Sequence, residues 1–371
     1  MMDRLDTRQL NRATLDRQLL LRRAARPALD AIGHLAGLQA QAPLAPYVGL
    51  WTRLAGFGHD DLKDLLMERI VVRAHLMRNT VHLVTAADFV RFRPLYQPRI
   101  ERDLSGHFGR NLRDLDLAEL RAVAAVLLAE TPLTRGQLGE RLSARWPDHD
   151  PASLAYAATH LLQLVQVPPR GLWGHRGQAS WFLASAWLDG LTPAAWDTDT
   201  ALEQLALRYL GAYGPATVRD IQAWSGLSRL REVTDRLGAR LRTFTGPDGA
   251  ELLDLPDASR PDADVPAPPR FLPEYDNLLL SFADRSRVIR GARPVPLPPG
   301  HGASVGTLLV DGFWAAEWRI TRGRDLAVLE ILPFGPLGTL RQDAIGAEGS
   351  ALLEFAAPAA GHDVRFAAPH N

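Results

Sequence analysis

Two glutamines separated by one residue are the part of this chain best suited to chemistry. Gln39 and Gln41 lie at the end of an apolar segment, residues 27–39, whose periodicity predicts a helix. On a continuing helix, residues two apart point to roughly opposite sides, so both amides can serve one site only if the helix ends there. Pro43 and Pro46 favour such an end, because neither can donate to a helical carbonyl. We therefore expect Gln39 and Gln41 to flank a cleft.

A carboxamide suits a limited range of reactions. It offers one carbonyl acceptor and two N–H donors and stays neutral, so it can orient a water molecule but hardly deprotonate it. The structural alternative is that the two glutamines only cap the end of a helix, and their spacing alone does not exclude it. His34 lies five residues before Gln39, and we expect it to pack rather than to transfer protons.

Composition excludes several kinds of site. The 371 residues are 46% hydrophobic and 23% charged, which is typical of a globular chain of two or three units. The absence of cysteine excludes disulfides, thiolate nucleophiles and cysteine-bound metals. Lys63 is the only lysine and follows no glycine-rich turn, which excludes a P-loop and disfavours a lysine Schiff base. We interpret Asp148-His149-Asp150 as a loop entering a helix at Pro151, and expect no metal or cofactor.

Charge is balanced overall but not locally. The formal net charge is zero, yet arginines outnumber acidic residues between Arg69 and Arg102, which predicts either a surface facing phosphates or a solvated helix face. The N-terminus has no apolar signal segment, and the apolar runs are too short to span a membrane. We expect a cytoplasmic protein that makes no membrane contact.

One arrangement of helices followed by a strand pair recurs three times. The first copy has predicted helices over residues 14–23, 27–39 and 60–69, and strands over 71–77 and 80–85 around Arg78-Asn79. The second has helices beginning after Asp116, Thr134 and Asp150, the last over residues 151–166, and a strand over 180–183. The third has helices over residues 202–213, 217–225 and 229–237, and a hairpin turning at residues 246–249.

Two helices, a recognition helix and a hairpin form the winged helix-turn-helix arrangement, which is typical of DNA binding. We therefore predict an α+β fold with three tandem winged helix-turn-helix units over residues 1–110, 111–198 and 199–258. A linker rich in Pro, Asp and Ala follows at residues 255–270. Residues 270–371 are expected to form a β-rich, barrel-like domain, with strands over 278–282, 305–310, 312–320 and 326–332.

Three motifs in this order resemble the winged-helix DNA glycosylases of the AlkZ type. They are Gly37-Leu38-Gln39-Ala40-Gln41, residues 73–84 (RAHLMRNTVHLV), and residues 272–280 (LPEYDNLLL) with 284–287 (DRSR). The resemblance implies a monofunctional glycosylase that acts on double-stranded DNA carrying bulky N7-alkylguanine adducts or interstrand crosslinks. It also implies self-resistance to a DNA-alkylating natural product. We expect a monomer, nucleoid-associated when bound to DNA.

The resemblance makes Gln39 and Gln41 the catalytic pair. The family's motif is Gln-x-Gln, whereas a related branch has Gln-x-Asp, and Gln41 at the second position favours substrates that need little base assistance. Alkylation at guanine N7 supplies such a substrate, because the cationic base departs as a neutral molecule. The enzyme then has to position a water and stabilise the oxocarbenium charge that develops on the sugar. With Lys63 as the only lysine, we expect an abasic product rather than a nicked strand.

We also predict a set of DNA-binding residues from the two hairpins. They are Arg73, Arg78, Thr80, His82, Trp173, His175 and Arg176. The structural alternative is a solvated hairpin tip for Arg78, Thr80 and His82, and core packing for Trp173. We expect Tyr275, Asp276, Asp284 and Arg285 to form salt bridges and turns. Two other functions stay open, a non-catalytic winged-helix regulator and a housekeeping glycosylase for small alkylpurines.

Overall fold

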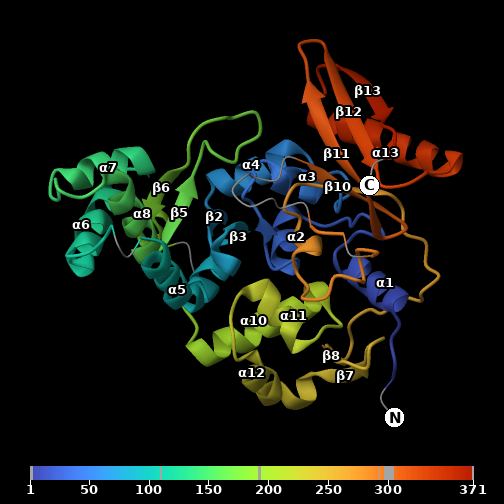
Figure 1. The fold of residues 1–371 in the computed structure, drawn as a ribbon, viewed down its shortest axis with the longest axis horizontal. Helices are drawn as coiled ribbons and strands as arrows, with labels where there is room; N and C mark the ends of the chain where they lie inside the picture. Colours follow the sequence, from blue (N-terminus) through green and yellow to red (C-terminus); the bar gives the residue numbers. More distant parts are fainter. Residues whose placement is uncertain (1–2, 109–110, 191–193, 292, 296–304, 370–371) are drawn as a thin grey trace.

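The structure is a computed structural model that describes residues 3–108, 111–190, 194–291, 293–295 and 305–369. It is a mixed α and β protein in which an arm carrying α6–α8 and another carrying β11–β13 extend from a central body (Figure 1). None of the described helices combines the length and apolar character needed to cross a membrane.

The N-terminal segment supplies short helices and the first hairpin. They are α1 (Thr7–Arg17), α2 (Ala28–His34), β1 (Leu38–Gln39), α3 (Ala45–Trp51), α4 (His59–Met67), β2 (Val71–His75) and β3 (Val81–Thr85). Asp6 begins α1 with a capping box, because its side chain accepts from the backbone of Gln9 and the Gln9 side chain accepts in return. The predicted turn at Arg78-Asn79 is confirmed, and both residues have positive φ.

The central sheet joins two hairpins that are far apart in sequence. Its strand order is β1-β3-β2-β5-β6-β4, with β4 (Leu133–Thr134), β5 (Leu164–Val167) and β6 (Ser180–Leu183). The junction is the antiparallel pairing of β2 with β5 at Arg73 and Gln166. The two hairpins that the sequence suggests as separate wings therefore share one sheet.

The helices around the second hairpin begin where the sequence predicts. Asp116, Thr134 and Asp150 are the N-caps of α6 (Leu117–Glu130), α7 (Arg135–Ser143) and α8 (Pro151–Leu161), and Thr134 forms its predicted capping box with Gln137. The predicted helix over residues 151–166 is wrong in its end, because Leu164–Val167 is strand β5. A short apolar run fits a buried strand as well as a helix. Helix α5 (Ala86–Phe108) connects the first hairpin to this group and packs on α8.

The third group is close to its predicted bounds. It consists of α10 (Thr198–Tyr213), α11 (Val218–Ser225), α12 (Leu230–Leu237), β7 (Arg242–Thr245) and β8 (Glu251–Asp254), preceded by the short α9 (Ala184–Trp187). The turn predicted at residues 246–249 closes the hairpin between β7 and β8. Tyr209, Tyr213 and Trp224 pack together in the main hydrophobic core, which the third group shares with β2, β3 and α5.

The C-terminal sheet is open, not barrel-like. Its order is β13-β12-β11-β10-β9, with β9 (Arg270–Leu272), β10 (Gly306–Val310), β11 (Phe313–Arg322), β12 (Leu326–Pro333) and β13 (Gly361–Phe366). Helix α13 (Thr339–Ala356), absent from the sequence prediction, contacts β9, β12 and β13. It buries one face of the sheet, so the sheet need not close into a barrel.

The strand predicted over residues 278–282 is wrong. Asp276 instead caps a 3-10 turn at Asn277–Leu279 by accepting from Leu278 N.

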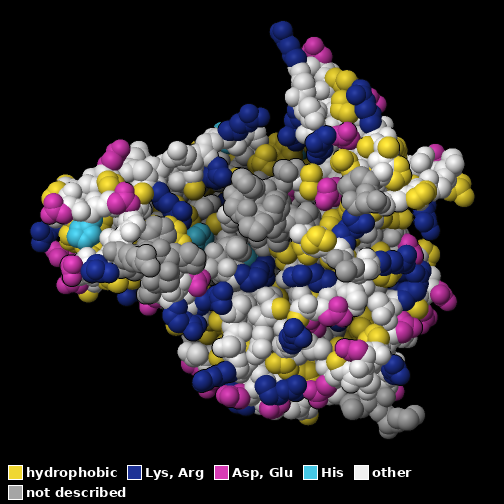
Figure 2. Space-filling model, in the orientation of Figure 1, with side chains coloured by type: hydrophobic (Ala, Val, Ile, Leu, Met, Phe, Trp, Pro, Cys, Tyr) yellow, Lys and Arg dark blue, Asp and Glu magenta, His cyan; other side chains and the backbone are white. Residues whose placement is uncertain are grey.

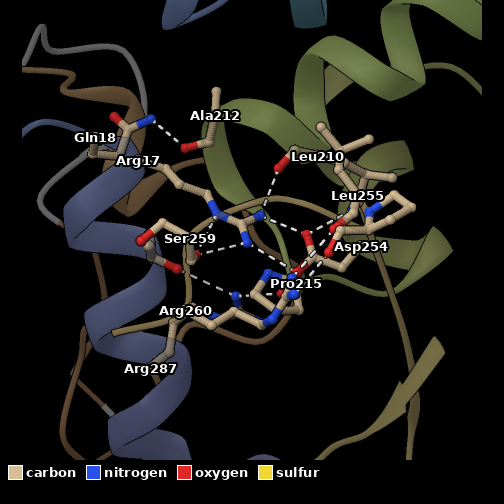
Figure 3. Close-up of polar contacts among 12 residues, drawn as sticks. Arg17, Gln18, Leu210, Ala212, Pro215, Asp254, Leu255, Ser259, Arg260 and Arg287 are labelled. Carbon is tan, nitrogen blue, oxygen red and sulfur yellow. Dashed lines mark hydrogen bonds and ion pairs between the residues drawn. The ribbon is translucent and has the colours of Figure 1, made fainter. Parts of the chain in front are cut away.

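A buried ion network ties the start of the chain to the third group (Figure 3). Arg17 of α1 donates to both carboxylate oxygens of Asp254 at 2.6 and 2.9 Å, and Arg260 also binds this carboxylate. Arg17 further donates to Leu210 O and Ser259 O. The predicted linker at residues 255–270 thus packs against α1.

Candidate functional site

Gln39 lies on strand β1 and Gln41 on the bend that follows it, so neither is at the end of a helix. Helix α2 ends at His34, before the expected position, and Ala36 and Gly37 follow with positive φ. Strand β1 then pairs with β3, placing Gln39 opposite His82. The two side chains do not line one cleft as we expected, because Gln39 borders a small internal cavity and Gln41 lines a separate, larger one.

Gln39 is held inside the protein. Its side chain is part of a residue only 6% exposed, and its Oε1 accepts from an Arg78 guanidinium nitrogen at 2.8 Å. It borders a cavity of about 10 Å³ that Gln18, Arg53 and Asn277 also line. This volume is close to the minimum that holds one water molecule.

Gln41 faces a much larger space. The residue is exposed, and its Oε1 accepts from Val81 N at 3.3 Å. It lines a cavity of about 560 Å³ between the first hairpin and the segment around β5 and β6. That volume is in the range of small-molecule sites. The polar side chains that share it with Gln41 are Arg73, His75, Asn79, Thr80, Arg135, Tyr156, His160, Gln166, Arg170 and Gln178.

Arg73 positions the segment between the two glutamines. It is 2% exposed and donates to Ala40 O at 2.9 Å and to Pro43 O at 3.3 Å. Burial lowers its pKa to about 10, which still leaves it charged near neutral pH. Its Nε has no hydrogen-bond partner within the described part of the chain. Arg73 therefore fixes the backbone of the motif and still has a donor to spare.

Arg78 turns into the protein. Its φ is 55°, and its guanidinium donates to Gln39 and to Trp224 O at the end of α11. Gly226 lies against it so closely that a Cβ there would be 3.2 Å from Arg78 N. The predicted contact of Arg78 with DNA therefore competes with these internal hydrogen bonds.

His82 and Thr80 differ in what they can reach. His82 has no exposed surface, and its Nδ1 lies 3.0 Å from Thr80 O. Burial lowers the pKa of His82 to about 3, so the ring is neutral at pH 7. A direct contact of His82 with DNA is not available in this conformation, and that prediction does not fit its burial. Thr80 is half-buried, donates to Met77 O at 3.1 Å, and lines the cavity beside Gln41.

The three predicted residues of the second hairpin also separate. Trp173 stacks on His59 with ring centroids 4.2 Å apart and contacts Tyr47 and Phe355. It therefore packs inside an aromatic cluster, which is the structural alternative to a DNA contact. His175 and Arg176 are exposed on the loop before β6. These two remain available to a ligand.

Sequence reasoning missed the histidines of the cavity. Burial lowers the pKa of His75 to about 3 and that of His160 to about 4, so both rings are neutral at pH 7. Asn79 Nδ2 lies 3.5 Å from His160 Nε2 and donates to Asp103 at 3.3 Å. His75 and Asn79 lie in the 73–84 motif, which was the available signal. His160, at the end of α8, offered none.

The C-terminal motif has the structural role that we expected of Asp276 and Asp284. Asp276 accepts a buried two-point ion pair from Arg53 at 2.8 and 2.9 Å. Asp284 accepts from the backbone and hydroxyl of Ser286 and so forms a turn. Across the described ranges, no cluster of three or more His or carboxylate side chains is arranged to hold a metal ion.

Comparisons with known proteins point in one direction. A family model described as "DNA glycosylase AlkZ-like" matches residues 32–355. An "Interstrand DNA cross-link repair glycosylase" from Streptomyces sahachiroi is 25% identical over 349 residues, which cover 88% of each chain. The solved structure of the Streptomyces sahachiroi DNA glycosylase AlkZ has a TM-score of 0.75 and 21% identity, and the match covers 98% of this chain and 100% of that one.

Proposed function

Because the chain belongs to the AlkZ-like DNA glycosylase family, we propose that it hydrolyses the N-glycosidic bond of N7-alkylguanines, with Gln39 and Gln41 at the reaction site. The observation that carries the proposal is the placement of Gln41 at a 560 Å³ polar cavity, two residues from a Gln39 that Arg78 holds. Both amides lie on backbone fixed by Arg73. Held amides of this kind are what a water-positioning site requires.

The proposed reaction is a simple displacement by water. The water oxygen bonds to the anomeric carbon, the bond to N9 breaks, and its electron pair neutralises the cationic purine. The remaining proton goes to solvent. Each glutamine carbonyl accepts one protein donor and retains a second lone pair, so it can orient the water. Lys63 is exposed on α4 and pairs with Asp60 at 2.6 Å, which supports a monofunctional enzyme with an abasic product.

We propose that the three groups of helices and hairpins act as winged helix-turn-helix units at a duplex, within residues 1–110, 111–198 and 199–258, followed by the C-terminal domain at 270–371. Many arginine side chains lie where the arm carrying α6–α8 meets α10–α12, which supports a phosphate-facing surface (Figure 2). Thr80, His175 and Arg176 are the predicted contacts that remain, and Arg73, which is 2% exposed, can reach DNA only through the cavity beside Gln41. We propose a monomer in the cytoplasm that joins the nucleoid when it binds DNA.

We extend the proposal to bulky adducts and interstrand crosslinks. The support is the similarity to the relative from Streptomyces sahachiroi, which is named for crosslink repair. Self-resistance to a DNA-alkylating natural product is the biological role that we propose. Disrupting the gene should then increase sensitivity to such a compound, while expression in a sensitive host should reduce it.

The test is single-turnover excision. A duplex carrying one 7-methylguanine, and a second carrying an N7-guanine crosslink, are incubated with excess protein, and abasic sites are scored. We expect Gln39→Ala and Gln41→Ala each to slow excision by about a hundredfold. Gln163→Ala, an exposed glutamine outside the cavity, is the matched control and should match wild type.

The outcomes separate the alternatives. A regulator would leave every adduct intact, and a housekeeping enzyme would release 7-methylguanine but not the crosslink. Full activity in both Gln39→Ala and Gln41→Ala would remove these residues from the reaction. Trapping of a covalent complex with borohydride would contradict the monofunctional assignment.

A further inference from the structure

The cavity beside Gln41 carries positive charge without a matching carboxylate. Arg73, Arg135 and Arg170 all line it. Within the described part of the chain, none of the three forms an ion pair with an acidic residue, although most other buried arginines do, as Arg17 and Arg53 show. Charged side chains in a concave site without counter-charge attract an anion.

Arg73 is the strongest element of this site. The residue is 2% exposed, yet its Nε finds no acceptor among the described residues, and the guanidinium makes its other hydrogen bonds to neutral oxygens. The buried Nδ1 of His75, on the same cavity wall, also has no partner there. An unsatisfied buried polar group destabilises the fold, so two such atoms on residues that line one cavity favour a ligand there.

Arg135 sits at the mouth of the cavity. It is exposed, and its guanidinium lies 5.4 Å from the ring centre of Tyr156 and 5.6 Å from that of Trp181. It is also the first residue of α7, where the helix dipole already gives a positive potential. A cation is disfavoured at that end of a helix, and an anion in the cavity would offset the repulsion.

These features select the chemistry of the ligand. A cationic alkylpurine would be repelled by three arginines, whereas a phosphate group is anionic and accepts hydrogen bonds from guanidinium groups. We propose that this cavity binds one phosphodiester of the lesion-bearing strand and thereby places the sugar of the lesion against Gln41. The proposal rests on the proposed glycosylase function and adds a specific phosphate subsite to it.

The test removes the charge of one phosphate at a time. Duplexes with a single 7-methylguanine carry one neutral methylphosphonate at successive positions around the lesion, and binding is measured by fluorescence anisotropy. For wild type we expect one position at which the dissociation constant rises about tenfold or more. In Arg135→Gln the same position should have a smaller effect than in wild type, because one partner of that phosphate is already lost.

Arg141→Gln is the matched control, since Arg141 is exposed on the same helix and does not line the cavity. It should keep the wild-type response at every position. Equal responses of wild type and Arg135→Gln at all positions would overturn the subsite.

Inorganic phosphate provides a second arm of the test. If it competes with DNA for wild type but no methylphosphonate position is coupled to Arg135, the cavity binds free phosphate and the assignment to the DNA strand is wrong.

Excision of the unmodified lesion duplex is measured in parallel, and it decides the proposed function separately. Wild-type excision without coupling refutes only the subsite. Coupling in the binding assay without excision refutes the glycosylase proposal and leaves the phosphate subsite standing.

Discussion

A single guanidinium connects the first hairpin, the third helical group and the glutamine motif. Arg78 donates to Gln39 and to Trp224 O, so its position depends on α11 as well as on its own turn. A residue that orients an amide affects the rate of the reaction more than the affinity for DNA. A residue that contacts a phosphate affects the affinity and its dependence on salt.

Replacing Arg78 by alanine distinguishes these two roles. We expect Arg78→Ala to slow single-turnover excision more than tenfold at saturating DNA, while the slope of log Kd against log salt stays at the wild-type value. Arg176→Ala, which removes an exposed arginine, should reduce the magnitude of that slope by about 0.9. A reduced salt slope in Arg78→Ala would return this residue to the DNA contacts.

His82 predicts how stability responds to pH. Burial lowers the pKa of His82 to about 3 from the usual 6.5, so the unfolded chain binds a proton that the folded protein rejects. His82 adds no pH dependence above pH 6.5. Below it, the free energy of unfolding decreases as the pH falls from 6.5 towards 3. Between pH 7 and pH 5 we expect His82 to account for a loss of about 2 kcal/mol. Urea unfolding at both pH values measures it.

The control for this prediction is a second histidine. His82→Asn should show a smaller loss of stability between pH 7 and pH 5 than wild type, whatever its stability at pH 7. His175→Asn, at an exposed position, should follow the wild-type dependence. An unchanged dependence in His82→Asn would mean that the ring does not stay neutral in the folded protein.

At the scale of elements, the turn between α2 and β1 decides where the glutamines lie. Gly37 has φ 90°, and a Cβ at this position would meet Val84 Cγ1 at 2.6 Å and Leu83 O at 3.0 Å. Both contacts are on β3, the strand that pairs with β1. Only glycine fits this position without displacing β1 from β3.

We therefore expect Gly37→Ala to lower the free energy of unfolding by about 2 kcal/mol or more and to slow excision, because β1 must move. Gly56→Ala is the control, since Gly56 has φ 75° but no atom lies within 4 Å of the position that a Cβ would take. It should lose only about 1 kcal/mol, from backbone strain, and keep full activity. Chemical denaturation and the excision assay measure both effects. Equal losses in the two variants would mean that contact with β3 is unimportant.

At the scale of the whole molecule, buried ion pairs hold the parts of the chain together. Asp254 on β8 is fully buried and forms ion pairs with both Arg17 of α1 and Arg260 of the following segment (Figure 3). Arg53 and Asp276 form a similar buried contact between the N-terminal region and the C-terminal motif. Removal of one partner from such a pair leaves a buried charge without compensation.

We expect Asp254→Asn to destabilise the protein by about 3–5 kcal/mol, measured by urea unfolding. The exposed pair of Asp199 with Arg236 is the comparison, and Asp199→Asn should change stability by less than about 0.5 kcal/mol. A small effect of Asp254→Asn would show that water or another group compensates the two arginines. In that case α1 is not anchored to the third group by charge.

Local signals were sufficient for much of the secondary structure. The N-caps at Asp116, Thr134 and Asp150 and the turn at residues 246–249 are set by residues at most a few positions apart, so sequence reasoning placed them. Helix α13 was missed, because Gly346 and Gly349 lower the helix propensity of that segment. Its helical state depends on packing against β9, β12 and β13.

The sequence by itself determined the repeated helices and hairpins, the resemblance to a glycosylase family, and the position of the two glutamines in the chain. Only the tertiary structure decided that β2 pairs with β5, that Arg78 holds Gln39, and that His82 is buried. It also brought Arg135 and Arg73 to one cavity. The physical reason is distance along the chain. Caps and turns depend on neighbouring residues, whereas sheet pairing, burial and uncompensated charge depend on residues that only the complete fold brings together.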